Sequence, residues 1–239
     1  MNDDWVVQPH GELIELDKGL FTVAGEIVMP LGRFPRRMTI AVLAGRGLAL
    51  WSPIPLADKQ MIELEKLGNP TFLIVPGVSH RLDIRAWKQR YASAAVICAP
   101  GAREAVEEAI PVDAVGDVLG DAAVRMETAP GVGEKEAILW VKRAAGVTLV
   151  VNDILANVRH PHGIGAQVMA RLLGFGVDRP RMPKIGKRLF LKDPKALAAG
   201  FRQWAKTDGL RRIVVSHGDP ITDPVPVLKR AADELDRMK

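Results

Sequence analysis

Short runs of apolar residues, each ending at a polar or glycine-containing loop, constrain the fold of this chain more than any other feature. They lie at residues 71–75, 94–98, 147–151 and 213–215. Runs this short and this apolar predict strands that are buried on both faces. Helical patterns lie around the first two runs, at residues 58–67, 83–91 and 102–109. This alternation predicts parallel strands that are joined by crossover helices.

The first fifty residues have a different pattern. Strand-like segments follow one another with only short turns between them, at residues 13–16, 20–27, 38–43 and 47–51. Consecutive strands joined by turns predict an antiparallel meander. Later in the chain, further strands are predicted at residues 124–128 and 136–141, and helices at residues 193–207 and 226–238. Asp193 is expected to cap the first of these helices, with Pro194 at its first position.

The order of these elements has two similar halves. Strands and then βα units occur in the first half, and strands, helices and a final βα unit occur in the second. Two mixed sheets, packed face to face with helices on the outside, account for that order. We therefore predict the α/β class and a four-layer αβ/βα sandwich, formed as one domain over residues 1–239. A chain of this length can bury such a core without disulfides.

The cysteine content and the N-terminus bear on the compartment. The one cysteine, Cys98, lies in an apolar run, so we expect a buried and inert thiol in a reducing compartment. The acidic first residues lack the basic and apolar regions of a signal peptide. No segment approaches the roughly 18 apolar residues of a membrane span. We predict a cytoplasmic protein with no membrane partner; its formal charge of +5 permits an acidic partner without demanding one.

Residues with metal-ligating side chains follow three of the apolar runs. His80 lies in the loop after residues 71–75, Asp153 follows residues 147–151, and His217 follows residues 213–215. The order and spacing of these segments resemble the metallo-β-lactamase superfamily. The resemblance implies a metal site built from loops, in which histidines and an aspartate hold zinc or iron and activate a water molecule for hydrolysis.

Position by position, the resemblance is partial. His217 matches the family's final His-Gly, and Asp153 matches its bridging aspartate. The hallmark His-x-His-x-Asp-His is not restored in any register of Ser-His-Arg-Leu-Asp-Ile-Arg at residues 79–85. Val132 stands where the family has a further histidine after a Pro-Gly turn. The chain is also similar to an uncharacterised branch of the superfamily, through Ser-Pro-x-Pro-Leu at residues 52–56 and a histidine loop before a helix with a tryptophan.

The reduced motif leaves three functions open. The first is a metal-dependent hydrolase of esters, amides or phosphoryl groups, with one zinc or iron ion on His80, Asp153 and His217 and with Asp83 as the proton shuttle. The second is a non-catalytic ligand-binding or interaction module on the same fold. The third is nucleic-acid binding or processing, which rests on a basic stretch at residues 171–192 with few aromatic residues for base stacking. The small-molecule ligand and the oligomeric state are not indicated by the sequence.

Other candidate motifs are weaker. His160 and His162 form a His-x-His that could supply replacement metal ligands, although an exposed polar loop is the preferred interpretation. Gly131 and Gly133 lie between two strands and do not open a helix, so they are not a dinucleotide-binding fingerprint. Ser52 is a candidate nucleophile to which the sequence assigns no partner.

Overall fold

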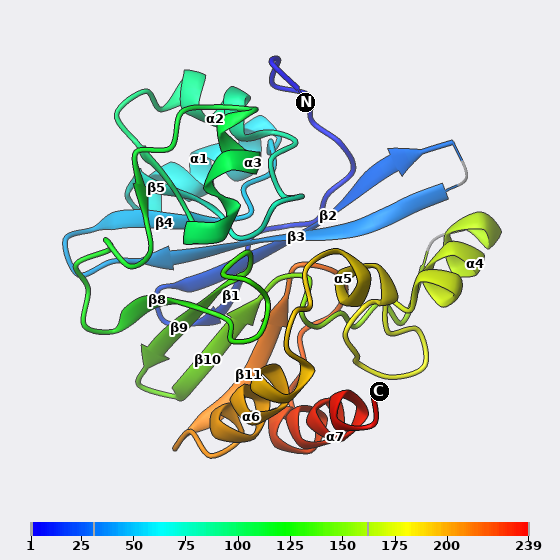
Figure 1. Ribbon diagram of the computed structural model, residues 1–239. Coiled ribbons are helices and arrows are strands. Elements are labelled where there is room, and N and C mark those ends of the chain that lie inside the picture. The colour runs from blue at the N-terminus through cyan, green and yellow to red at the C-terminus, as the bar shows by residue number, and fades with distance from the viewer. Residues whose placement is uncertain (1, 31, 162, 239) are drawn as a thin grey trace.

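The computed structural model describes residues 2–30, 32–161 and 163–238 and contains two β-sheets that pack together (Figure 1). The seven strands of the first sheet lie side by side in chain order: β1 (Ile14–Asp17), β2 (Leu20–Met29), β3 (Gly32–Val42), β4 (Gly47–Trp51), β5 (Asn69–Val75), β6 (Ala95–Cys98) and β7 (Ala114–Val115). Pairing is antiparallel from β1 to β4 and parallel from β4 to β7. The predicted meander and the predicted parallel strands are both confirmed.

The second sheet has four strands in the order β11-β10-β9-β8. They are β8 (Val124–Thr128), β9 (Ala137–Arg143), β10 (Gly146–Val151) and β11 (Leu210–Val215). The last two strands, β10 and β11, pair in parallel, and the other pairs are antiparallel. Each sheet is therefore mixed, and each has parallel strands whose carboxyl ends meet at one edge.

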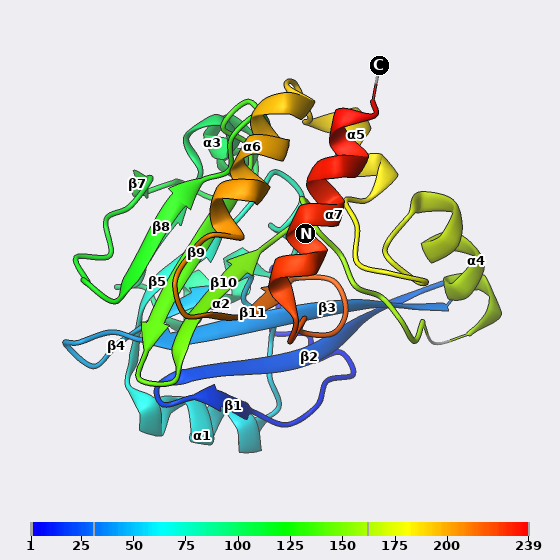
Figure 2. The same ribbon diagram turned by 90° about the horizontal axis from the view of Figure 1, so that it is seen from below.

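Helices cover the outer face of each sheet (Figures 1 and 2). The first sheet is covered by α1 (Asp58–Leu67), α2 (Ile84–Arg90), the 3₁₀ turn Pro100–Ala102 and α3 (Arg103–Glu107). The second sheet is covered by α6 (Pro194–Trp204) and α7 (Pro224–Asp236). Two further helices, α4 (Ile164–Leu173) and α5 (Lys184–Leu189), follow β10, and α4 contacts β3 of the β2–β3 hairpin. This order of layers confirms the αβ/βα sandwich.

Contacts between the two sheets combine apolar packing with a few buried hydrogen bonds. Leu20 and Met38 of the first sheet share one buried cluster with Leu139 of the second. The indole Nε1 of Trp51 donates to Ser216 Oγ over 3.2 Å, which joins the carboxyl end of β4 to that of β11. That residues 1–239 form one domain stays a prediction, and this shared core supports it.

The largest difference from the predicted strands is at the start of β3. We expected a strand at residues 38–43, but β3 begins at Gly32, and its first residues pair with the end of β2 up to Met29. The start of this strand was not predicted because the arginines and Pro35 interrupt the alternation of apolar and polar residues. The β2–β3 hairpin therefore reaches past the rest of the sheet (Figure 1).

The two helix starts at Asp193 and Asp83 differ in how they are capped. Asp193 caps α6 as expected, because its carboxylate accepts from Ala196 N over 3.0 Å. Asp83 stands at the N-cap position of α2, but its side chain makes no capping bond. Its carboxylate instead accepts hydrogen bonds from Arg36 and Asn2.

Cys98 is buried as predicted, and burial raises the pKa of its thiol to about 11. A thiol with such a pKa stays protonated near neutral pH and is a poor nucleophile. Among the described residues, no helix is both long enough and apolar enough to cross a membrane.

Candidate metal centre

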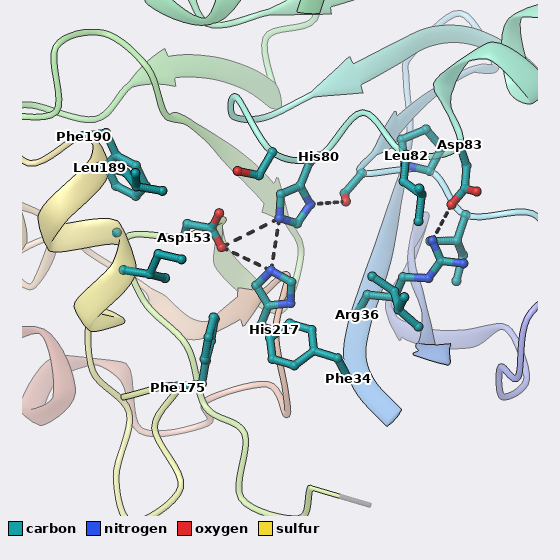
Figure 3. A pocket seen from close by; sticks show the side chains of 17 residues that line it. Phe34, Arg36, His80, Leu82, Asp83, Asp153, Phe175, Leu189, Phe190 and His217 are labelled. Carbon is teal, nitrogen blue, oxygen red and sulfur yellow. Dashed lines mark hydrogen bonds and ion pairs between the residues drawn. The ribbon is translucent and has the colours of Figure 1, made fainter. Parts of the chain in front are cut away.

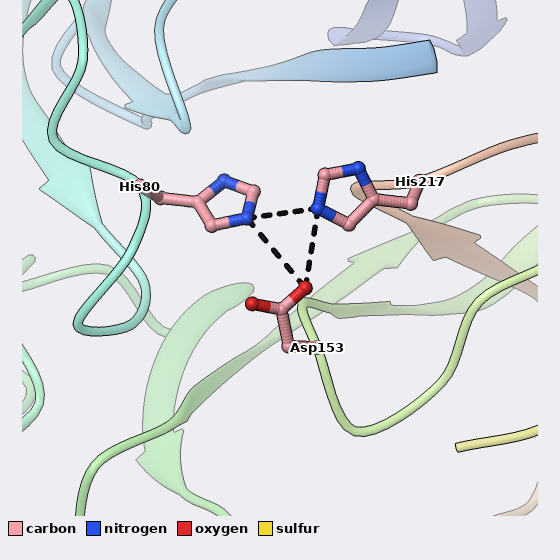
Figure 4. Close-up of side chains that lie close together, drawn as sticks. All are labelled: His80, Asp153 and His217. Atoms are coloured by element: carbon pink, nitrogen blue, oxygen red, sulfur yellow. Dashed lines mark hydrogen bonds and ion pairs between the residues drawn. The ribbon is translucent and has the colours of Figure 1, made fainter. Parts of the chain in front are cut away.

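Three loops at the carboxyl ends of buried strands bring His80, Asp153 and His217 together (Figure 4). His80 follows β5 of the first sheet, whereas the other two follow β10 and β11, which are adjacent and parallel in the second sheet. The carboxyl ends of parallel strands open at the same edge of a sheet, which is where α/β proteins place functional loops. The two sheets therefore contribute to one group at their common edge.

The ligand atoms of these side chains face one another. His217 Nε2 lies 3.1 Å from Asp153 Oδ1 and 3.1 Å from His80 Nε2, and the remaining pair, His80 Nε2 and Asp153 Oδ1, is 3.7 Å apart. Zinc-bound atoms of a tetrahedral site, at about 2.0–2.2 Å from the ion, lie about 3.3–3.5 Å from one another. The three atoms thus have the spacing and chemistry of one face of such a site.

The outer nitrogen of each imidazole ring is occupied by a hydrogen bond. His217 Nδ1 donates to the carbonyl oxygen of Pro35 over 2.8 Å, which fixes the proton on Nδ1 because a carbonyl only accepts. His80 Nδ1 lies 2.7 Å from Ser52 Oγ. A neutral His217 then points its Nε2 lone pair at the Asp153 carboxylate, and this arrangement requires a cation between them, either a proton or a metal ion.

The pKa shifts within the group also favour a cation between the histidines and the carboxylate. Burial lowers the pKa of His217, but the Asp153 carboxylate and the Pro35 carbonyl outweigh it, so that the pKa is raised overall. Burial lowers the pKa of His80, and Asp153 only partly offsets this. Burial raises the pKa of Asp153, but the two histidines outweigh it and hold the pKa far below its ordinary value. Asp153 is therefore an anion, and His80 is neutral and able to ligate.

A buried carboxyl group lies directly beneath Asp153. Glu136 is fully buried, and its Oε2 accepts from Asn152 Nδ2 over 3.0 Å and from Asp153 N over 3.1 Å. Burial and the charge of Asp153 raise the pKa of Glu136 well above its ordinary range. Glu136 thus orients the loop that carries Asp153. This role was not predicted, because in the sequence Glu136 is an ordinary polar residue at a strand end.

A cavity of about 250 Å³ opens beside the group (Figure 3). Its walls include Phe34 from the outer part of the β2–β3 hairpin, Phe175 after α4, and Leu189 and Phe190 at the end of α5. None of these was a sequence candidate, because an apolar residue on a loop or a short helix carries no functional signal of its own. The group therefore lies in a cleft with mainly apolar walls, the usual surroundings of a small-molecule site.

Asp83, the predicted proton shuttle, lines the same cavity but is paired with Arg36 (Figure 3). The two side chains are 1% and 7% exposed, and the second Asp83 oxygen accepts from Asn2 Nδ2 over 2.8 Å. Both carboxylate oxygens are thus engaged. Its catalytic role stays a prediction.

The other sequence candidates lie apart from the group. Val132, where the resemblance suggested a further histidine, is fully buried in the apolar core of the second sheet. His160 is exposed and is not part of the group, and His162 lies outside the described residues. In the basic stretch, Arg179 pairs with Glu234 of α7 over 2.7 Å. Ser52, by contrast, has gained a partner in His80.

Comparison with known proteins shows which fold this is. No family model and no curated protein matches the sequence. Solved structures do match, over nearly their whole length. A metallo-β-lactamase from Hirschia baltica is 14% identical, with a TM-score of 0.63, and the match covers 95% of this chain and 98% of that one. The chain has the metallo-β-lactamase fold.

Two further structures with this fold give the same result. The metallo-β-lactamase FIM-1 from Pseudomonas aeruginosa, in its mono-zinc form, is 11% identical with a TM-score of 0.65, and the match covers 99% of this chain and 100% of that one. A metallo-β-lactamase from Erythrobacter litoralis is 13% identical with a TM-score of 0.64, over 93% and 96% of the two chains. At these identities the likeness concerns the fold and says nothing about the substrate.

Proposed function

We propose that this chain is a metal-dependent hydrolase that holds one zinc or iron ion on His80, Asp153 and His217. The observation that carries the proposal is the convergence of two Nε2 atoms and one carboxylate oxygen within 3.1–3.7 Å of one another. Two histidines and a carboxylate suit either ion, and three protein ligands leave a position open for water or substrate. A relative in the fold, FIM-1, was solved in a mono-zinc form.

Each residue of the site has a part in this proposal. A bound ion would polarise a carbonyl or phosphoryl oxygen and lower the pKa of water. Ser52 and the Pro35 carbonyl hold the histidine rings so that both Nε2 atoms face the ion. Asp83 is the proposed proton shuttle, and to act it would have to release one of its two hydrogen bonds, to Arg36 or to Asn2.

Metal analysis with a matched pair of variants tests the proposal. Wild-type protein purified without chelator is expected to contain nearly one equivalent of zinc or iron, and His217→Ala is expected to lose it. His160→Ala, which removes an exposed histidine outside the group, should retain the metal. A wild type that takes up no metal even from added zinc or iron would contradict the proposal, and so would a His217→Ala protein with full metal content.

The second candidate is a non-catalytic binding module, which the loss of ligands favours. Val132 is buried in the core and the hallmark histidines are missing, so the group has three ligands. Without metal, a protonated His217 paired with Asp153 satisfies the same atoms. If this alternative is correct, the protein should bind a ligand in the cavity without holding a metal ion and without hydrolysing the ligand. We also propose that the chain belongs to the uncharacterised branch of the superfamily, because it has the Ser-Pro-x-Pro-Leu segment at residues 52–56.

Nucleic-acid binding is the third candidate and has the least support. It rests on the basic stretch at residues 171–192, in which Arg179 is neutralised by Glu234 and Lys187 is half-buried beside the same acid. Phosphate contacts require exposed charge and weaken steeply with salt. Fluorescence anisotropy with a labelled oligonucleotide at two salt concentrations measures this directly.

A further inference from the structure

The walls of the cavity bear on the substrate class of the proposed hydrolase. Most of the large side chains around the ligand group, which consists of His80, Asp153 and His217, are apolar. They come from four separate segments: the β2–β3 hairpin, residues 53–54 after β4, the loop before α2, and the segment from Phe175 to Phe190. Apolar walls bind by removing apolar surface from water, and they offer nothing to a charged group. The composition of the walls therefore bears on the chemistry of the ligand.

The part of the apolar wall next to the ligand group consists of aromatic rings. The rings of Phe34 and Phe175 lie 4.7 Å apart in an edge-to-face contact. Both also contact the His217 ring, at 4.9 Å and 5.7 Å. A molecule whose reacting atom is next to His217 Nε2 therefore has aromatic surface immediately beside it.

Helix α5 supplies the outer part of the wall. It approaches Asp153 so closely that a Cβ on Gly186 would lie 3.0 Å from the Asp153 carbonyl oxygen. Ile185 and Leu189 line the cavity, yet they remain 41% and 55% exposed. The basic residues of this helix, Lys184, Lys187 and Arg188, do not line the cavity. The helix thus offers partly uncovered apolar surface to a ligand.

Most of the charged and polar groups of the lining are engaged with one another. Arg36 and Asp83 neutralise each other in a buried pair. Ser52 is bonded to His80. The remaining polar lining residue, Ser79, carries an uncharged hydroxyl group. Away from the metal ligands, no cation of the described lining is left to balance a carboxylate or phosphate on a substrate.

We infer that the substrate is an uncharged ester or amide with an apolar acyl group, which packs against Phe34, Phe175 and Leu189 while its carbonyl lies at the ligand group. This inference rests on the proposed hydrolase function. In the reaction, the water oxygen bonds to the carbonyl carbon and the bond from that carbon to the leaving oxygen or nitrogen breaks. The leaving atom takes a proton from the water. A β-lactam, whose ring system carries a carboxylate, fits this cavity poorly.

A series of p-nitrophenyl esters tests the substrate class. From acetate through butanoate to hexanoate, kcat/KM is expected to rise two- to fourfold for each methylene that becomes buried. The p-nitrophenyl ester of glutaric acid, which has a charged acyl end, is expected to react at least tenfold more slowly than the uncharged hexanoate. Equal rates for these two esters, or no dependence on chain length, would overturn the inference.

Two leucines provide matched variants for the wall. Leu189 on α5 lines the cavity and Leu172 on α4 does not, and the two are similarly exposed, at 55% and 66%. Leu189→Asn is expected to lower kcat/KM for the hexanoate about tenfold and to change that for the acetate much less. Leu172→Asn should change neither value. The inference fails if the two variants behave alike.

A binding measurement separates this inference from the proposed function. The uncharged fluorophore N-phenyl-1-naphthylamine is expected to bind chelator-treated wild-type protein and Leu172→Asn, and to bind Leu189→Asn several-fold more weakly. If the wild type takes up no metal and hydrolyses no ester but shows this binding pattern, the hydrolase proposal fails and the apolar ligand class stands. If the fluorophore does not bind, or binds all three proteins equally, the apolar ligand class is wrong.

Discussion

Ser52 Oγ lies 2.7 Å from His80 Nδ1, and Ser52 holds this position with a backbone φ of 50°. A left-handed φ is unfavourable for a residue with a Cβ, by about 1–2 kcal/mol. The residue that follows, Pro53, has no N–H and so cannot help to form an oxyanion hole beside a serine nucleophile. Ser52 is therefore better suited to orient His80 than to attack a substrate.

Replacing Ser52 with glycine should separate stability from metal binding. Ser52→Gly removes the hydroxyl group and relieves the left-handed φ, so the free energy of unfolding should change by less than about 1 kcal/mol. Metal affinity should fall about 10- to 100-fold, because an outer hydrogen bond to a ligating histidine is lost. Competition with a chelating dye measures the affinity, and urea unfolding measures the stability.

Glu134 provides the control for this variant. It also has a left-handed φ, of 57°, and it is not among the metal-site residues. Glu134→Gly should leave metal affinity unchanged. If Ser52→Gly binds metal as tightly as the wild type, the hydroxyl group does not position His80.

The buried pair of Arg36 and Asp83 predicts a large loss of stability. Asp83→Asn leaves the Arg36 guanidinium buried without a counter-charge, which should cost about 3–5 kcal/mol in urea unfolding. The double variant Arg36→Met, Asp83→Leu should recover most of that loss, because apolar side chains replace buried ion pairs well. An Asp83→Asn protein of wild-type stability that no longer hydrolyses esters would instead favour the role of Asp83 as a proton shuttle.

Glu136 should make the folded protein less stable as the pH rises above the ordinary carboxyl value. Burial and the charge of Asp153 raise its pKa in the folded protein, so folding binds a proton once the pH exceeds the ordinary carboxyl value of about 4.5. Stability from this group is therefore full below about pH 4.5 and falls as the pH rises, by up to about 1.4 kcal/mol per pH unit, until the raised pKa is passed. Glu136→Gln removes this loss, and its stability relative to the wild type should increase from pH 4.5 to pH 7.5. Parallel stability curves for the two proteins would show that Glu136 is ionised in the folded state.

Cys98 should be unreactive in the folded protein. Burial raises the pKa of its thiol to about 11, and the side chain is fully buried. At pH 8, iodoacetamide should modify the native protein far more slowly than the protein unfolded in urea. Mass spectrometry of timed samples gives both rates, and equal rates would mean that the strand carrying Cys98 opens readily.

The sequence was most informative where local signals decide the structure. The bounds of β4, α1 and β8 agree with the predicted residues 47–51, 58–67 and 124–128, because turn residues and periodicity mark them clearly. The candidate ligands were found through their positions in the loops that follow apolar strands. Parallel pairing of β10 and β11 brings Asp153 and His217 together. His80 joins them only because the loops of the two sheets meet at a common edge.

The parts of the site that the sequence did not predict depend on contacts between distant segments. The outer half of β3 is rich in arginine and contains Pro35, so no strand pattern is visible there. Its Phe34 meets Phe175, and Ser52 meets His80, only after the sheets and loops have assembled. A local sequence pattern does not indicate which distant residue a side chain will contact. A histidine or aspartate after a predicted buried strand, by contrast, can be recognised from the sequence alone.

Because His80 and His217 lie on loops of different sheets, their contact can form only late in synthesis and folding. The two residues are 137 positions apart in the chain, and their imidazole rings touch only when β11 has joined β10 and the second sheet has docked on the first. A growing chain must therefore reach residue 217 before the pair can exist. The proposed metal ion would therefore bind chains that have already folded, and it would not guide the early steps of folding.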